Sequence, residues 1–183
     1  MEQNWKVQLF ELNYDEQERN AVSGVLKSGW ITSGPKTKEF ENSFSRYLGG
    51  DYFACAVSSC TAALHLALLA SKIGRGDEVI IPALTFVAAA NVVLNVGAKP
   101  VMADCTSYHD WNVSLKTIKS AISSKTKAVM IVHFAGAPCE EILLIKEYCK
   151  SENLILIEDV AHAPGASLGG RMCGTFGDFG CFS

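Results

Sequence analysis

Short apolar runs alternate with longer segments of helical character along most of this chain, and few folds accommodate such an alternation. Strands that are apolar throughout are typical of sheets covered on both faces. Helices of roughly ten to fifteen residues between them favour right-handed crossovers. The sequence therefore predicts an α/β protein with three layers, α/β/α, around a mostly parallel sheet. The predicted strands cover residues 53–57, 78–82, 99–104, 127–134 and 153–159.

The segments between these runs carry the end signals of helices. Pro35 stands at a first-turn position and Gly49–Gly50 follows the same segment, as expected for a helix start and stop. The glycines of 169–180 are irregularly spaced, which favours a hairpin and tight turns over a phosphate loop. The predicted helices cover residues 15–29, 35–48, 61–74, 86–97, 114–123 and 140–152.

Length, composition and charge limit the class of protein. The chain has 183 residues, of which 49% are hydrophobic and 19% charged, with a formal net charge of −3. These values predict a folded domain of ordinary size, with small molecules rather than nucleic acid or an anionic membrane as partners. The N-terminus lacks a basic segment followed by an apolar core, and no apolar window has the length of a membrane span, which favours a cytoplasmic protein.

The cysteines do not form a recognisable framework. Seven of them are spread along the chain without a C-x-x-C pair. A disulfide scaffold or a zinc site normally shows closer spacing, so neither is predicted and no metal is expected. Most of these cysteines are expected to be small buried side chains in a reducing compartment.

The segment 154–165, LILIEDVAHAPG, carries two acids and a histidine directly after an apolar strand. In parallel α/β sheets, ligands bind beyond the carboxyl ends of the strands, so a carboxylate delivered there is a candidate for chemistry. Asp159 is the first candidate and Glu158 is the rival carboxylate. The alternative for Asp159 is a structural role, in which it caps the following turn.

A site for an anionic group is predicted at residues 58–62. Neither G-x-x-x-x-G-K-[ST] nor G-x-G-x-x-G follows a predicted strand, which argues against the usual nucleotide-binding loops. The small residues at 58–62 instead open a long helix, where free backbone N–H groups, the helix dipole and the hydroxyls of Ser59 and Thr61 can bind an anion. Ser and Thr are also ordinary N-caps, so the segment alone leaves both interpretations open.

The order of these elements and four stretches of sequence resemble the DegT/DnrJ/EryC1/StrS family of sugar aminotransferases. The resemblance runs from about Trp30 to Ser183 and implies the large domain of the aspartate-aminotransferase (type I) fold, with pyridoxal 5′-phosphate as cofactor. It also implies an N-terminal helical arm at 1–30, a partial cofactor-binding domain at 31–183, and a C-terminal small domain absent from this chain. The stretches are WITSGPKTKEFE, SSCTAALHLALLASKIGRGDEVIIPALTFVAAANVVLNVGAKPVMADC, KTKAVMIVHFAGAP and LIEDVAHAPGASLGGRMCGTFGDFGCFS.

The resemblance also implies roles for residues at the ring of the cofactor. Asp159 would pair with the protonated pyridine nitrogen, keeping the ring an electron sink. Phe86 resembles the aromatic side chain that stacks on the ring, and its alternative is a plain core aromatic at a helix start. His162 lies where the family carries a Gln or His that reaches the ring hydroxyl, and its alternative is a turn residue.

Thr61, Ala62 and Ser183 match the phosphate-binding positions of the family. The sequence departs from the commonest pattern at Cys60, where Gly or Ala is usual, and at Ala62, where Ser is frequent. One side-chain donor is thereby lost, and we expect backbone donors to hold the phosphate.

The family's catalytic lysine, which holds the cofactor as a Schiff base, is expected beyond Ser183, so no catalytic residue is assigned in this chain. The chain is interpreted as the N-terminal portion of an enzyme that transfers an amino group, by analogy from glutamate, to a keto sugar linked to a nucleotide. Alone it is expected to be inactive, and the full-length form is expected to be a homodimer. The alternatives are a sugar 3-dehydrase of the same family, in which histidine replaces the lysine, and a non-catalytic shortened paralogue.

Overall fold

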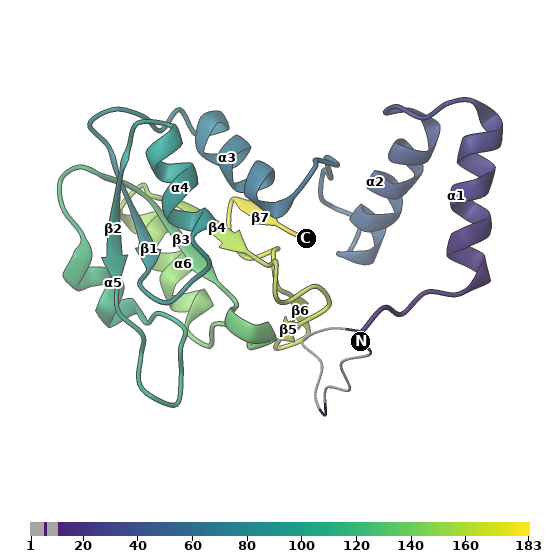
Figure 1. Ribbon diagram of the computed structural model, residues 1–183. Coiled ribbons are helices and arrows are strands. Elements are labelled where there is room, and N and C mark those ends of the chain that lie inside the picture. Colours follow the sequence, from purple (N-terminus) through teal and green to yellow (C-terminus); the bar gives the residue numbers. More distant parts are fainter. Residues whose placement is uncertain (1–5, 7–10) are drawn as a thin grey trace. The chain divides into compact units, whose positions relative to one another are not determined.

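The chain divides into two compact units in its computed structural model, which describes Lys6 and residues 11–183 (Figure 1). The boundary between the units lies between Ala56 and Val57. Each unit has its own elements, and the predicted site residues all belong to the second.

The described part of the first unit contains two helices, and both were predicted from the sequence. They are α1 (Glu16–Ser28) and α2 (Pro35–Tyr47). Asp15 caps α1 in a capping box, in which the Glu18 carboxylate accepts the Asp15 N–H at 2.7 Å. Pro35 occupies the first turn of α2, where its missing N–H costs no helical hydrogen bond.

The strand predicted at 53–57 is wrong. These residues are described and have no strand assignment. The Ala56 N–H, which a ladder would use, is donated instead to the Glu41 carboxylate at 3.0 Å, and the Phe53 side chain is fully exposed. A short apolar run forms a strand only where a neighbouring strand accepts its hydrogen bonds, and this one has none in the described residues.

The second unit is built on a parallel sheet of five strands in the order β2-β1-β3-β4-β7, as the fold prediction required (Figure 1). Its central strands β1 and β3 are buried at every residue except Lys127, which explains why their sequences are mostly apolar without alternation. The strands are β1 (Glu78–Pro82), β2 (Lys99–Ala103), β3 (Thr126–Val132), β4 (Ile155–Asp159) and β7 (Phe179–Cys181).

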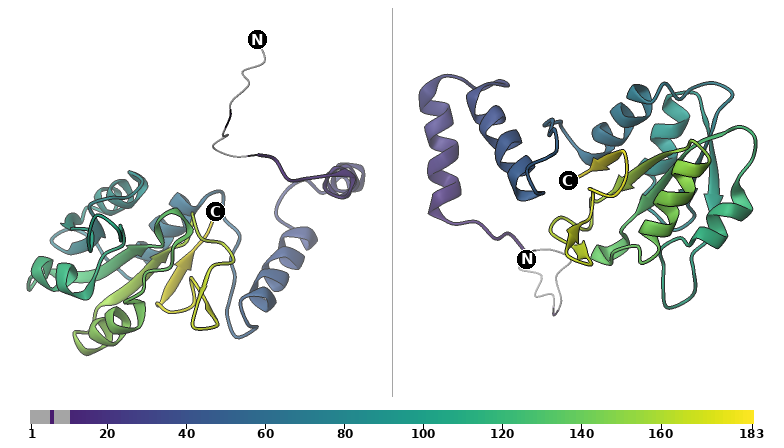
Figure 2. Two further views of the ribbon diagram at one scale, coloured as in Figure 1. Left: turned by 90° about the horizontal axis from the view of Figure 1, so that it is seen from below. Right: turned by 180° about the vertical axis from the view of Figure 1, so that it is seen from behind.

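Helices cover both faces of this sheet (Figure 2). On one face Val79, Ile81 and Met130 form an apolar cluster with α3 and α4. On the other face Ile80 and Ile131 pack with α5 and α6. The helices are α3 (Cys60–Ala70), α4 (Ala88–Asn95), α5 (Leu115–Ala121) and α6 (Ile142–Ser151), each somewhat shorter than predicted.

Short elements complete the second unit. A 3₁₀ turn, η1 (Phe134–Gly136), follows β3, and the glycine-rich segment forms the predicted hairpin from β5 (Ser167–Leu168) and β6 (Arg171–Met172). The strand β7 was not predicted, because three residues centred on a glycine carry no strand pattern. No helix in the described part of the chain is both long and apolar enough to cross a membrane.

Candidate functional site

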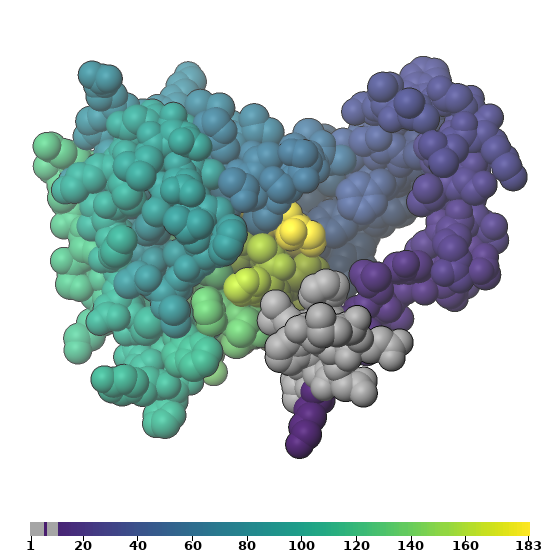
Figure 3. Space-filling model, in the orientation of Figure 1, coloured from purple at the N-terminus to yellow at the C-terminus, as the bar shows by residue number. Residues whose placement is uncertain are grey.

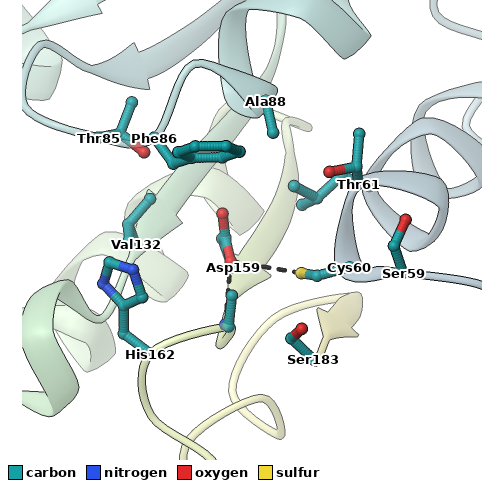
Figure 4. Close-up of a pocket in the computed structure, with 12 residues that line it drawn as sticks. Ser59, Cys60, Thr61, Thr85, Phe86, Ala88, Val132, Asp159, His162 and Ser183 are labelled. Carbon is teal, nitrogen blue, oxygen red and sulfur yellow. Dashed lines mark hydrogen bonds between the residues drawn. The ribbon is translucent and has the colours of Figure 1, made fainter. Parts of the chain in front are cut away.

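A pocket opens at the carboxyl edge of the parallel sheet, and five of the six predicted site residues line it (Figure 4). This is the edge at which α/β sheets bind ligands. The exception is Ala62. The lining residues are Ser59, Cys60, Thr61, Leu64, Thr85, Phe86, Ala88, Val132, Asp159, Ala161, His162 and Ser183.

Asp159 is the last residue of β4 and is only 5% exposed. Its Oδ1 accepts two hydrogen bonds, from the backbone N–H of Ala161 at 3.0 Å and from the Cys60 thiol at 3.4 Å. Its Oδ2 has no partner among the described residues, and Figure 4 shows it directed toward the space beneath the Phe86 ring. One oxygen is therefore held by the protein, while the other is available to a ligand that donates a proton.

Glu158, the rival carboxylate, lies outside the pocket. Successive side chains of a strand point to opposite faces, so Glu158 and Asp159 cannot share one site. Glu158 is fully buried and accepts hydrogen bonds from His133 Nε2 at 2.9 Å and from three backbone N–H groups of the turn 174–177 at 2.6–2.7 Å. The hydrogen bonds that Glu158 accepts from described residues thus all lie outside the pocket.

The N-terminus of α3 offers unpaired backbone donors. Ser59 is the N-cap, and its hydroxyl accepts the N–H of Ala62 at 3.1 Å, so this N–H is not free for a ligand. The N–H groups of Cys60 and Thr61 have no partner among the described residues, and α3 contributes its positive dipole end there. Ser183 also lines the pocket, and the C-terminal residues lie at the surface beside α3 (Figure 3). This end of the pocket can bind an anion.

His162 and Phe86 occupy the remaining sides of the pocket. The Nδ1 atom of His162 accepts the backbone N–H of Ala135 at 3.2 Å, and its ring meets Phe134 edge-on at 5.5 Å. Phe86 is 66% exposed, so it is not the core aromatic of the alternative interpretation. An aromatic ring left open over a buried carboxylate can stack on a flat ligand.

The sequence predicted no functional role for two residues that line the pocket. Cys60 is buried, and burial together with the nearby Asp159 charge raises the pKa of its thiol, so that the group stays protonated and can donate. The hydroxyl oxygen of Thr85 is buried and lacks a hydrogen-bond partner in the described residues. The only sequence signal for either was its position beside a predicted site residue, because contacts across 99 positions, such as that of Cys60 with Asp159, leave no local pattern.

Comparison with known proteins decides the family. The family model described as the DegT/DnrJ/EryC1/StrS aminotransferase family matches residues 13–183, nearly the whole chain. The chain belongs to this family. Its fold is accordingly that of the type I pyridoxal-phosphate aminotransferases, in agreement with the solved relatives.

Curated relatives and solved structures of family members agree with this assignment. GDP-perosamine synthase of Escherichia coli O157:H7 is 41% identical over 97% of this chain and 48% of its own length. The aminotransferase TlmJ of Streptoalloteichus hindustanus superposes with a TM-score of 0.90 at 35% identity, over 97% of this chain and 48% of its own. Spr1654 of Streptococcus pneumoniae, solved in a PLP form, gives a TM-score of 0.83 at 34% identity, over 93% and 47%. This DegT-family chain thus spans less than half the length of the curated relatives it matches.

Proposed function

We propose that this chain supplies the cofactor-binding part of a pyridoxal-phosphate enzyme that transfers an amino group from glutamate to a keto sugar linked to a nucleotide. Membership of the family supports amino transfer, and the 41% identity to a GDP-perosamine synthase supports a nucleotide-linked sugar as substrate. The observation that carries the proposal is the Asp159 carboxylate, with one oxygen bonded to the protein and the other open to the pocket.

The pocket fits pyridoxal phosphate at the ring. When bound, this cofactor supplies an electron sink, provided that its ring nitrogen stays protonated. Asp159 Oδ2 would accept that N–H, and the carboxylate's negative charge would favour the protonated form. Phe86 would cover one face of the ring and limit the access of water.

The pocket also fits the phosphate. The N–H groups of Cys60 and Thr61 and the hydroxyls of Thr61 and Ser183 would bind its oxygens at the N-terminus of α3. Ala62 would contribute less to phosphate binding than the sequence predicts, since its N–H is already donated to the Ser59 hydroxyl. Because the anion sits at one end and Asp159 at the other, the two contacts would fix the orientation of the ring between them.

His162 would act at the ring hydroxyl. Its Nδ1 already accepts the Ala135 N–H, so Nε2 is the nitrogen that carries a proton and can donate. A donor at this position would stabilise negative charge on the ring oxygen.

Three parts of the proposal concern the whole enzyme. The lysine that anchors the cofactor covalently would come from outside residues 1–183, because the residues lining the pocket include no lysine. We also propose that the enzyme works in the cytoplasm as a homodimer, and that residues 1–30 act as an arm and 31–183 as the cofactor domain.

Amino transfer by the full-length protein tests this function directly. With glutamate, pyridoxal phosphate and a GDP-linked 4-keto sugar, mass spectrometry is expected to detect the GDP-linked amino sugar. The matched reaction without glutamate is expected to give at most one molecule of amino sugar per enzyme molecule. No amino sugar from any nucleotide-linked keto sugar would contradict the proposal, and multiple turnovers by the 183-residue chain alone would contradict the external lysine.

A further inference from the structure

Glu158 and His133 form a buried pair behind the pocket. Both side chains are 0% exposed, and the Glu158 Oε2 atom lies 2.9 Å from His133 Nε2. The other ring nitrogen of His133, Nδ1, accepts the backbone N–H of Cys139 at 3.0 Å. Because Nδ1 accepts, the ring proton lies on Nε2 and is donated to the carboxylate. The Cys139 N–H and the Glu158 carboxylate together therefore select the tautomer of His133.

His133 and Asn112 together hold the loop 133–139 in one conformation. The carbonyl of His133 accepts the N–H of Gly136 at 3.3 Å, while its ring binds the N–H of Cys139. Asn112 is 4% exposed and its Oδ1 accepts the N–H of Phe134 at 3.0 Å. The Asn112 Nδ2 donates to two further carbonyls of the same loop, at 3.2 and 3.4 Å. Two buried polar side chains thus hold the loop through hydrogen bonds to its backbone.

The loop presents one backbone donor to the pocket. Ala135 has φ 53° and ψ 25°, a left-handed conformation that residues with a Cβ seldom adopt. The hydrogen bonds of His133 and Asn112 offset the energetic cost of this conformation. The conformation directs the Ala135 N–H to Nδ1 of His162, at 3.2 Å. The loop 133–139 thus determines which nitrogen of His162 carries the proton. The conformation of this loop depends in turn on His133, which Glu158 holds outside the pocket.

We propose that Glu158, His133 and Asn112 are positioning residues that lock His162 in its Nε2–H tautomer and so present a hydrogen-bond donor to the ligand. They act through the loop 133–139 and do not touch the ligand themselves. The identity of the ligand, a ring with an acceptor oxygen at that edge, rests on the proposed function. The locked tautomer is a property of the ligand-free chain, so the two claims can fail separately.

Nitrogen-15 NMR of the histidine rings tests the tautomer in the unaltered, ligand-free chain at pH 8. Both His133 and His162 are expected to show the Nε2–H pattern, with one pyridine-like Nδ1 each. An Nδ1–H pattern or an averaged pattern at His162 would overturn the proposal. If pyridoxamine 5′-phosphate fails to bind while the pattern is as expected, the proposed function fails and the positioning network stands.

Two substitutions of Ala135 test the last link. Ala135→Gly keeps the N–H and accommodates a positive φ, so His162 is expected to stay locked. Ala135→Pro removes the N–H and cannot adopt this φ, so the His162 signals are expected to average. Ala135 is exposed, so a fold loss from either change is not expected. We also expect Ala135→Pro to weaken pyridoxamine 5′-phosphate binding by about fivefold, as for one lost hydrogen bond, with inorganic phosphate binding unchanged. A locked His162 in Ala135→Pro would overturn the proposal.

Glu158→Gln tests the first link. An amide has one oxygen and an NH₂ group, so it cannot accept all four donors that surround Glu158. We expect both histidines to lose their single tautomer. Ile118→Val, which removes one buried methyl group beneath α5, is the control for lost stability and is expected to leave both tautomers unchanged. If Ile118→Val releases His162 as much as Glu158→Gln does, the role is merely structural and the proposal is wrong.

Discussion

Asp159→Asn is the substitution whose effect on ligand binding follows most directly from the geometry. The amide must place its oxygen where Oδ1 now accepts the N–H of Ala161 and the thiol of Cys60, because an NH₂ group there would face two donors. Its NH₂ group then points into the pocket in place of Oδ2. A protonated ring nitrogen would meet a donor instead of an acceptor, so the ring is expected to bind in its neutral form.

The size of the effect follows from the hydrogen bond that is lost. A hydrogen bond to a charged group contributes about 1.5–3 kcal/mol, which corresponds to roughly a 10- to 150-fold change in dissociation constant. We expect the upper part of this range, since Asp159 is only 5% exposed and solvent screens it little. The phosphate contacts at α3 do not involve Asp159, so inorganic phosphate binding is expected to stay within about twofold.

Calorimetric titration with pyridoxamine 5′-phosphate measures this change, because that ligand needs no covalent anchor. The analogue in which C–H replaces the ring nitrogen isolates the contact: the unaltered chain should prefer the natural ligand strongly, and Asp159→Asn should prefer it less, because a neutral amide-to-nitrogen hydrogen bond replaces the charged one. Asp104→Asn is the matched control, since Asp104 follows β2 and, among the described residues, accepts a hydrogen bond from the neighbouring Cys105 N–H alone, at 2.8 Å. Equal affinities for Asp159→Asn and the unaltered chain, or equal losses for both variants, would refute the assignment of Asp159.

Thr61→Val keeps the shape of the side chain but removes its hydroxyl, so titrations are expected to show a parallel loss of about three- to tenfold for pyridoxamine 5′-phosphate and inorganic phosphate; a loss for only one ligand would argue against a phosphate contact. Gly180→Ala is expected to lower the free energy of unfolding in urea by about 2 kcal/mol or more, because a Cβ there would collide with the backbone of Gly174; an unchanged midpoint would contradict this. The free energy of unfolding is also expected to fall as pH rises from about 9 to 11. Burial raises the pKa of five thiols in the folded chain, whereas in the unfolded chain they ionise near the usual thiol pKa. Equal stability in urea at pH 8 and pH 10 would contradict this. These thiols belong to Cys60, Cys139, Cys149, Cys173 and Cys181.

The sheet could be predicted because its central strands are almost entirely buried. The runs that became β1, β2, β3 and β4 are mostly apolar, with charged residues near their ends, and that property is visible in a short window of sequence. The same lack of alternation leaves open which of Glu158 and Asp159 faces the pocket. A strand with no alternation gives no sign of which face each residue takes, so the residue pattern alone could not separate Glu158 from Asp159. The family resemblance favoured Asp159, and the assembled sheet shows Glu158 buried and Asp159 in the pocket.

The misplaced and missing elements have physical causes of the same kind. Residues 53–57 have strand composition but no partner strand in the described residues, whereas β7 has little strand composition and forms because β4 offers an open edge. The positions of the site residues came from the family resemblance, but their partners did not. The bond from Cys60 to Asp159 and the bond from Ala135 to His162 join segments far apart in sequence, which no local pattern records.

Equilibrium binding of pyridoxamine 5′-phosphate to the unaltered chain, followed by the absorbance of its ring, tests the central claim that residues 57–183 form a site for this cofactor. We predict saturation at one ligand per chain, competition by pyridoxal 5′-phosphate and by inorganic phosphate, and an absorbance typical of a protonated ring nitrogen. Absence of saturable binding, or a bound ring whose nitrogen is unprotonated at pH 7.5, would contradict the account.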